Sequence, residues 1–99
     1  MLVLQRKPGE ELVIGGSLRL KLVSCPHGAA RLELIEPGQD PRPLFQSVGA
    51  RRPIAPGVHL TVASAGRHFA KLGIDAPRNI EIHRAEVWER IRREKGEAA

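Results

Sequence analysis

Basic side chains stand at two places where alternating apolar residues predict the ends of strands. Arg6 and Lys7 close the first alternating run of the chain, and His83 and Arg84 close the last one. A guanidinium group is planar and carries several N–H donors, so it can bind a phosphate or the edge of a guanine base. Arg84 is the strongest candidate, and its alternative is an ordinary surface arginine. This pattern favours an interface for a polyanion.

Two hydrophobic periods in the C-terminal quarter of the chain place Arg84. Apolar residues alternate over Leu72–Ile74 and again over Ile80–Ile82, with a turn between the two runs. From Ala85 onward the apolar residues fall at helical spacing, at Val87, Trp88 and Ile91. The second strand therefore runs directly into a short helix, with Arg84 at the junction. Such a helix is marginal alone in water, so its apolar stripe needs a surface to pack on.

The earlier part of the chain predicts a meander of short antiparallel strands. Alternating runs occupy residues 2–6, 12–14, 18–22, 32–34 and 58–62, and glycine and proline separate them.

Prolines interrupt this pattern in the middle of the chain. We expect residues 38–56 to form a loop or linker, because proline has no N–H group for a sheet ladder. The segment contains Pro41, Pro43, Pro53 and Pro56. Its arginines, at positions 42, 51 and 52, form either a mobile basic arm or part of an unspecific solvated loop.

Composition narrows the class of function. The 99 residues predict one domain, and 16 Lys and Arg against 11 Asp and Glu favour nucleic acid or an anionic membrane surface as partner. Three aromatic residues and no tyrosine argue against stacking of bases on an aromatic platform. No catalytic constellation or metal-ligand spacing is present, and Cys25 is alone, so we expect neither an enzyme nor a metal or cofactor. Met1 begins a strand pattern instead of a signal peptide, and no run could span a membrane, which predicts a cytoplasmic protein.

The chain also resembles itself after a shift of 40 residues. The superposed identities are Leu4/Leu44, Gly9/Gly49, Ile14/Ile54, Leu20/Leu60, Ser24/Ser64, Ala30/Ala70, Leu32/Leu72 and Pro37/Pro77. A partial tandem duplication and an ordinary inserted hairpin both account for this similarity.

Two signatures at opposite ends of the chain resemble a known family. The opening M-L-x-L-x-R-K-x-G-E-x-x-x-I-G covers residues 1–15, and the closing G-x-x-A-P-x-x-I-x-I-H-R-x-E covers residues 73–86. Together they are similar to the carbon storage regulator family (CsrA/RsmA), small RNA-binding regulators of translation that recognise GGA in hairpin loops. The resemblance implies a mainly β protein, with a small antiparallel sheet, a C-terminal α-helix and a strand-exchanged homodimer.

The resemblance also implies the site. It places Leu4 and Arg6 of one chain beside Ile82, His83 and Arg84 of the partner chain, with Lys7 adding charge, in two equivalent RNA sites per dimer. Leu4 and Ile82 could instead be core residues, and His83 could instead cap the helix or be solvated. The helical spacing of Trp88 favours a packing role over RNA recognition.

Two features depart from the family pattern. Gln5 stands where the family usually carries Thr or Ser. The second departure is an insertion of about forty residues, which adds a Pro-rich loop and a hairpin within about residues 26–68. As a result, residues 64–68 replace the segment that ordinarily lies next to the RNA. Which hairpin, Leu18–Leu34 or Val58–Ile74, fills the family position stays open. We expect the whole chain, residues 1–99, to form one domain.

The expected partners are mRNA, a small regulatory RNA and a second copy of the chain. One polypeptide could instead form a pseudo-dimer, but the prolines and the single copy of residues 79–95 favour the homodimer. The competing function is a protein-interaction module or degenerate paralogue with altered or lost RNA binding, for example one bound by the flagellar assembly factor FliW.

Overall fold

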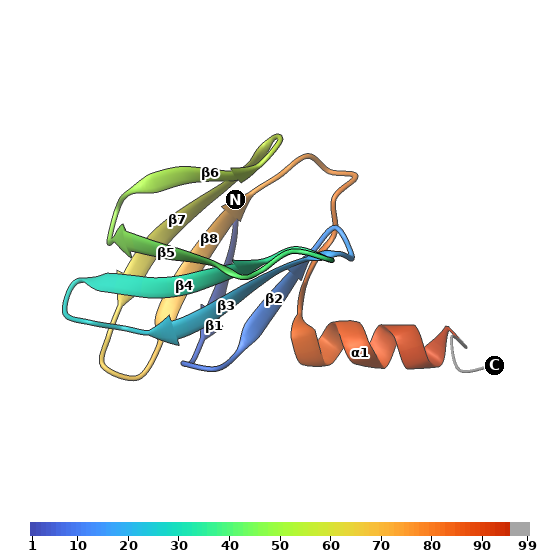
Figure 1. Ribbon diagram of the computed structural model, residues 1–99, viewed down its shortest axis with the longest axis horizontal. Coiled ribbons are helices and arrows are strands. Elements are labelled where there is room, and N and C mark those ends of the chain that lie inside the picture. Colours follow the sequence, from blue (N-terminus) through green and yellow to red (C-terminus); the bar gives the residue numbers. More distant parts are fainter. Residues whose placement is uncertain (96–99) are drawn as a thin grey trace.

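The computed structural model describes residues 1–95 and confirms a mainly β chain with antiparallel sheets and a C-terminal helix (Figure 1). In order, the elements of this part are β1 (Leu2–Arg6), β2 (Glu11–Ile14), β3 (Leu18–Ser24), β4 (Ala29–Ile35), β5 (Arg42–Ser47), β6 (Arg51–Ala55), β7 (Val58–Ala65), β8 (Ala70–Asp75), β9 (Ile82–Arg84) and α1 (Ala85–Glu94).

The strands form two sheets that enclose one core. One sheet has the order β1-β8-β7-β6 and the other has the order β5-β4-β3-β2-β9. Alternate residues of the strands point inward, so leucine, isoleucine and valine side chains from both sheets meet between them. The side chains of Leu20 and Leu60, one from each sheet, are completely buried. Helix α1 projects from one end of this body (Figure 1).

The sheets are built from two repeats that are related by a shift of 40 residues. Repeat 1 (residues 1–37) contains β1 to β4, and repeat 2 (residues 41–77) contains β5 to β8. The central hairpins have the same register, and each has an irregularity at the same position. Equivalent pairs are Leu20 with Leu34 and Leu60 with Ile74, then Leu22 with Leu32 and Val62 with Leu72. Such agreement favours a tandem duplication over an inserted hairpin.

The first strand of each repeat pairs with the last strand of the other repeat. Strand β1 pairs with β8, and β5 pairs with β4, so each edge strand lies in the sheet of the opposite repeat. The registers again agree after the shift, because Leu4 is opposite Leu72 and Leu44 is opposite Leu32. Strand exchange therefore takes place within a single chain.

The expectation of a loop over residues 38–56 was wrong, because β5 and β6 lie there. Both are edge strands, where a proline costs no ladder hydrogen bond if its nitrogen faces outward. Neither alternative for its arginines, a mobile basic arm or a solvated loop, describes this segment, since Arg42 forms an ion pair with Glu36 at 3.0 Å and Arg51 forms one with Asp75 at 3.1 Å. The arginines belong to the sheets.

Strand β6 presents an unpaired outer edge within the described residues. Its equivalent, β2, is covered by β9, and Gly15 donates its N–H to the Glu81 carbonyl across that boundary. Alternate residues of a strand direct their N–H groups to the same side, so Val13 also faces β9. The residue equivalent to Val13 in β6 is Pro53, which has no N–H group. Pro53 thus protects the open edge against pairing with another strand.

We predict that Pro53→Val increases self-association, because valine restores the missing donor on the edge of β6 and has a high β propensity. Sedimentation velocity over a range of protein concentrations measures this association. Pro41→Val is the matched control, since Pro41 lies outside β5. Identical sedimentation of the Pro53 variant and the unmodified chain would contradict the protective role.

Candidate nucleic-acid interface

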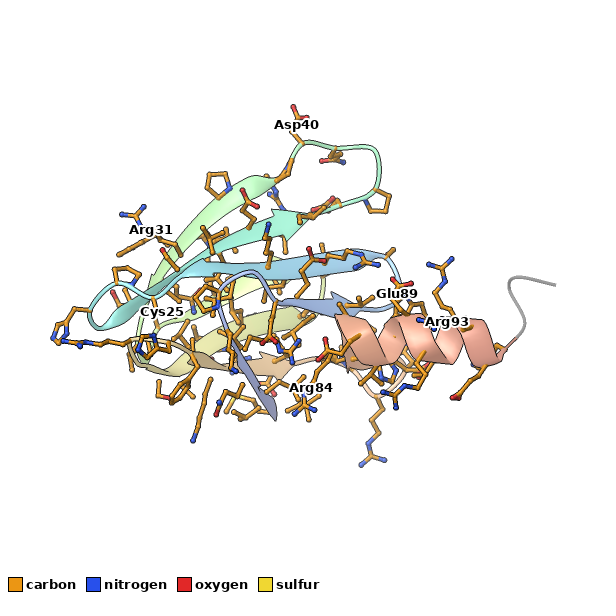
Figure 2. All side chains as sticks on the ribbon, turned by 90° about the horizontal axis from the view of Figure 1, so that it is seen from below. Cys25, Arg31, Asp40, Arg84, Glu89 and Arg93 are labelled. Carbon is orange, nitrogen blue, oxygen red and sulfur yellow. The ribbon has the colours of Figure 1, made fainter. Side chains whose placement is uncertain are left out.

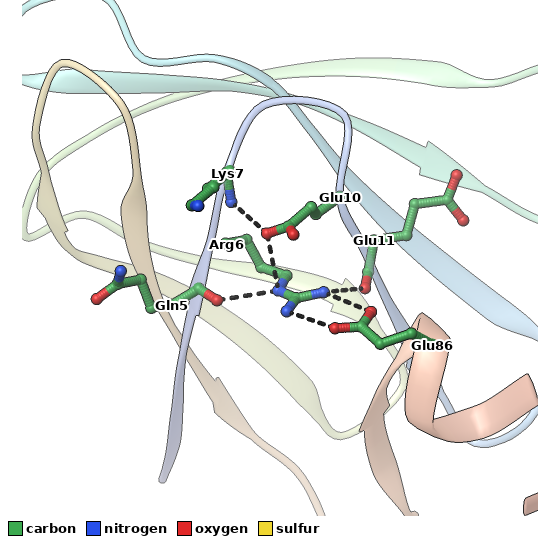
Figure 3. Close-up of polar contacts among 6 residues, drawn as sticks. All are labelled: Gln5, Arg6, Lys7, Glu10, Glu11 and Glu86. Carbon is green, nitrogen blue, oxygen red and sulfur yellow. Dashed lines mark hydrogen bonds and ion pairs between the residues drawn. The ribbon is translucent and has the colours of Figure 1, made fainter. Parts of the chain in front are cut away.

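Strands β1 and β9 are edge strands of different sheets, and an ion pair joins β1 to the helix that follows β9. Arg6 at the end of β1 binds Glu86 in the first turn of α1, directly after β9 (Figure 3). The resemblance assigned these two elements to different chains. Here they come together in one chain.

The guanidinium of Arg6 is enclosed by acceptors, and the residue is only 5% exposed. Its two terminal nitrogens donate to the two carboxylate oxygens of Glu86, each at 3.0 Å. Its Nε donates to the Gln5 carbonyl at 2.9 Å, and one terminal nitrogen also donates to the Glu11 carbonyl at 3.2 Å. The Glu10 carboxylate lies 3.7 Å from Nε. Arg6 therefore holds β1, β2 and α1 together, and its donors are engaged within the chain.

The charges of this pair support each other. The hydrogen bond from Arg6 is the main cause that lowers the pKa of Glu86 from 4.5 to about 2, and the Glu86 backbone N–H adds to it. The same bond raises the pKa of Arg6, so both groups are ionised at neutral pH. Sequence reasoning missed Glu86, although a signal was present. Arg6 is the arginine of the opening signature and Glu86 is the last residue of the closing one.

His83 supports the start of α1. Its Nε2 lies 3.1 Å from a Glu81 carboxylate oxygen, and its ring stacks on Trp88 with centroids 5.9 Å apart. Trp88 in turn lies over the turn after β2, where a Cβ added to Gly16 would meet the indole at 3.4 Å. Gly16 also has a φ of +81°, which favours glycine. These contacts agree with a packing role for Trp88 and leave His83 partly exposed.

A second ion-pair cluster fixes the other side of the helix. The Arg19 guanidinium lies 3.0 Å from the Glu89 carboxylate and 3.1 Å from that of Glu11, and these bonds raise the pKa of Arg19. No residue of α1 is fully buried. The direction of the helix therefore depends on Arg6, Arg19 and Trp88 more than on a deep apolar contact.

Arg84 and Lys7 are the basic side chains that this framework leaves in solvent. Both residues are exposed, and neither side chain makes a hydrogen bond or ion pair with another residue among 1–95. Figure 2 shows Arg84 beside the start of α1. Leu4 and Ile82 are half-buried and pack against the core, so they support the strands that carry the two cations. The arrangement can bind phosphates and base edges at one end of the two sheets.

Other kinds of site find no support in the described part of the chain. Residues 1–95 contain no cluster of three or more His, Cys, Asp or Glu side chains that could hold a metal ion. In the same residues, α1 is too short and too polar to cross a membrane.

The geometry defines a small antiparallel β protein in which two exposed cations, Lys7 after β1 and Arg84 at the end of β9, follow edge strands of different sheets. Residues 53–93 match the model of the CsrA family, described as a global regulator protein family. This match confirms the resemblance to the carbon storage regulator family and includes the Val58–Ile74 hairpin, β9 and most of α1. The opening signature lies outside the matched residues. No solved structure matches the chain.

Proposed function

We propose that this chain is a post-transcriptional regulator that binds GGA-containing hairpin loops of mRNA at the β1/β9 edge. Membership of the matched segment in the CsrA family supports RNA binding and regulation after transcription. The observation that carries the proposal is the position of Arg84. This exposed arginine stands at the end of β9, and the Arg6–Glu86 ion pair fixes the helix that follows it against the end of β1.

The chemistry of this edge suits a loop of single-stranded RNA. Arg84 provides a fork of donors for a phosphate or for the two acceptors on a guanine edge, and Lys7 provides a point charge for the backbone. Strand β1 is an edge strand, so its outward N–H and C=O groups are available to bases. Recognition of this kind needs no aromatic platform. The messages are bound in the cytoplasm, and a small regulatory RNA with the same loop competes for the site.

The test is a titration of the full chain with a labelled GGA hairpin and with a hairpin of the same stem and a scrambled loop. We expect tighter binding of the GGA hairpin, and a binding constant that falls with salt as cations release counterions from several phosphates. Fluorescence anisotropy at three salt concentrations measures both effects. Equal affinity for the two loops would contradict recognition of GGA. No binding to either RNA would favour a protein-interaction module, for which a FliW-like partner stays a prediction.

A further inference from the structure

We propose that one copy of this chain is a complete RNA-binding unit with a single site. The site at β1 and β9 is assembled within the chain, and the corresponding edge at β5 and β6 does not bind RNA. This inference rests on the proposed function. It specifies, in addition, that there is one RNA site and that a single chain forms it.

The first step is that the chain covers its own strands. Repeat 1 supplies β1 to the sheet of repeat 2, and repeat 2 supplies β5 to the sheet of repeat 1. Strand β9 then covers β2. The sequence favours a homodimer because of the prolines in residues 38–56 and the single copy of residues 79–95, but this proline-containing segment forms β5 and β6. With these strands present, a second chain is not needed to complete the core.

The second step is that β5 has no basic side chain at the two positions equivalent to Arg6 and Lys7. After the shift of 40 residues, Arg6 corresponds to Gln46 and Lys7 corresponds to Ser47. Gln46 is 4% exposed and points inward, where its Nε2 donates to the carbonyls of Ala50 and Leu60 at 2.6 and 2.9 Å. Gln46 therefore retains the buried position of Arg6, but the edge has lost the exposed cation of Lys7.

The third step is that no partner element for this edge is found among residues 1–95. In repeat 2, β8 is followed by β9 and α1, which carry Arg84 and Glu86. In repeat 1, β4 is followed through residues 36–41 by β5, and in the part of the chain that the structure describes no equivalent of β9 lies against β6. Pro53 occupies the position on β6 that would bond to such a strand. The second edge thus lacks both groups that form the first site.

A single site changes how the protein acts on a message. A two-site dimer can hold two hairpins of one RNA, and the second contact then gains from the high effective concentration of the linked loop. A chain with one site gains nothing from a second hairpin. Its occupancy on a message with two GGA loops follows from two independent binding events.

Light scattering coupled to size exclusion and calorimetric titration with a GGA hairpin test this proposal on the full chain. We expect a mass near 10.9 kDa for the free protein and one hairpin per chain. An RNA with two GGA hairpins should bind two chains, with the same affinity per loop as the single hairpin. A mass of two chains, two hairpins per chain, or a gain in affinity from linking the loops would overturn the single-site unit.

The outcomes for the two proposals can be distinguished. A stable dimer that binds GGA hairpins would overturn the single-site unit and leave the RNA-binding function in place. Absence of hairpin binding would overturn both. Mixing Arg84→Ala with Lys7→Glu chains after joint refolding adds a second measurement. A site made from two chains would recover in the mixture, since one of its combinations is unaltered, whereas a site within one chain shows no recovery.

Discussion

Replacement of Arg84 by alanine is expected to weaken the binding of a GGA hairpin about thirtyfold, or roughly 2 kcal/mol. The side chain is exposed, stands at the junction of β9 and α1, and has no acidic partner at ion-pair distance among residues 1–95. All its donors are therefore free for RNA, and alanine removes each of them. Anisotropy titration at constant salt measures the loss.

Arg52→Ala is the matched control for this prediction. Arg52 is also an exposed arginine without a described ion pair, but it lies on β6, at the edge that has lost its site. The same charge is removed, so a small loss in this variant measures the unspecific electrostatic contribution. Thermal unfolding should be almost unchanged in both variants, because the Arg84 side chain makes no capping hydrogen bond to α1. Similar losses of RNA affinity in the two variants would show that Arg84 has no specific role.

Local patterns predicted the elements that have strong periods. The alternation over residues 2–6, 18–22 and 58–62 marked β1, β3 and β7, and the change of period at Ala85 marked the start of α1. The prolines misled the prediction because the effect of a proline depends on whether its strand is central or at an edge. That property depends on the order of strands in the sheet, which the sequence near Pro53 does not contain.

The sequence proposed residues for the site, but it did not contain the contacts that bring their elements together. The resemblance brought β1 and β9 together, and the structure does place them at one edge, but within one chain. A buried arginine and an exposed one look alike in sequence, and the acceptors that enclose Arg6 include Glu86, 80 residues later. The 40-residue repeat contained the information on strand exchange. The equal registers of the two central hairpins in the structure are what identify the repeat as a structural duplication.

Glu86→Gln is expected to lower the free energy of unfolding by about 2 kcal/mol at neutral pH. A pKa that falls from 4.5 to about 2 means that the folded state stabilises the ionised carboxylate over the protonated one by roughly 3 kcal/mol. The Glu86 side chain is 56% exposed, so screening by solvent reduces this contribution to about 1.5 kcal/mol. The variant also leaves the buried Arg6 guanidinium without its carboxylate, which adds a desolvation cost. Chemical denaturation of the two proteins measures the difference.

Glu89→Gln is the control, because Glu89 lies in the same helix and also pairs with an arginine. Arg19 is 31% exposed, and a pair of this kind contributes about 0.5 kcal/mol. We therefore expect a clearly smaller loss than in Glu86→Gln. Equal losses would mean that burial of Arg6 does not strengthen its ion pair.

The pH dependence of the Glu86 variant separates this ion pair from ordinary packing. The folded state depresses the pKa of Glu86, so its contribution to stability is complete above about pH 4.5 and is lost as the pH falls towards about 2. The pKa of Arg6 is raised, so Arg6 stays protonated throughout the acid range and Glu86 is the member of the pair that changes charge there. The stability gap between the unmodified chain and Glu86→Gln should therefore be constant from pH 7 to about 5 and shrink below it. A gap that stays the same down to pH 3 would show that glutamine disturbs packing, and that the charge of Glu86 does not hold β1 against α1.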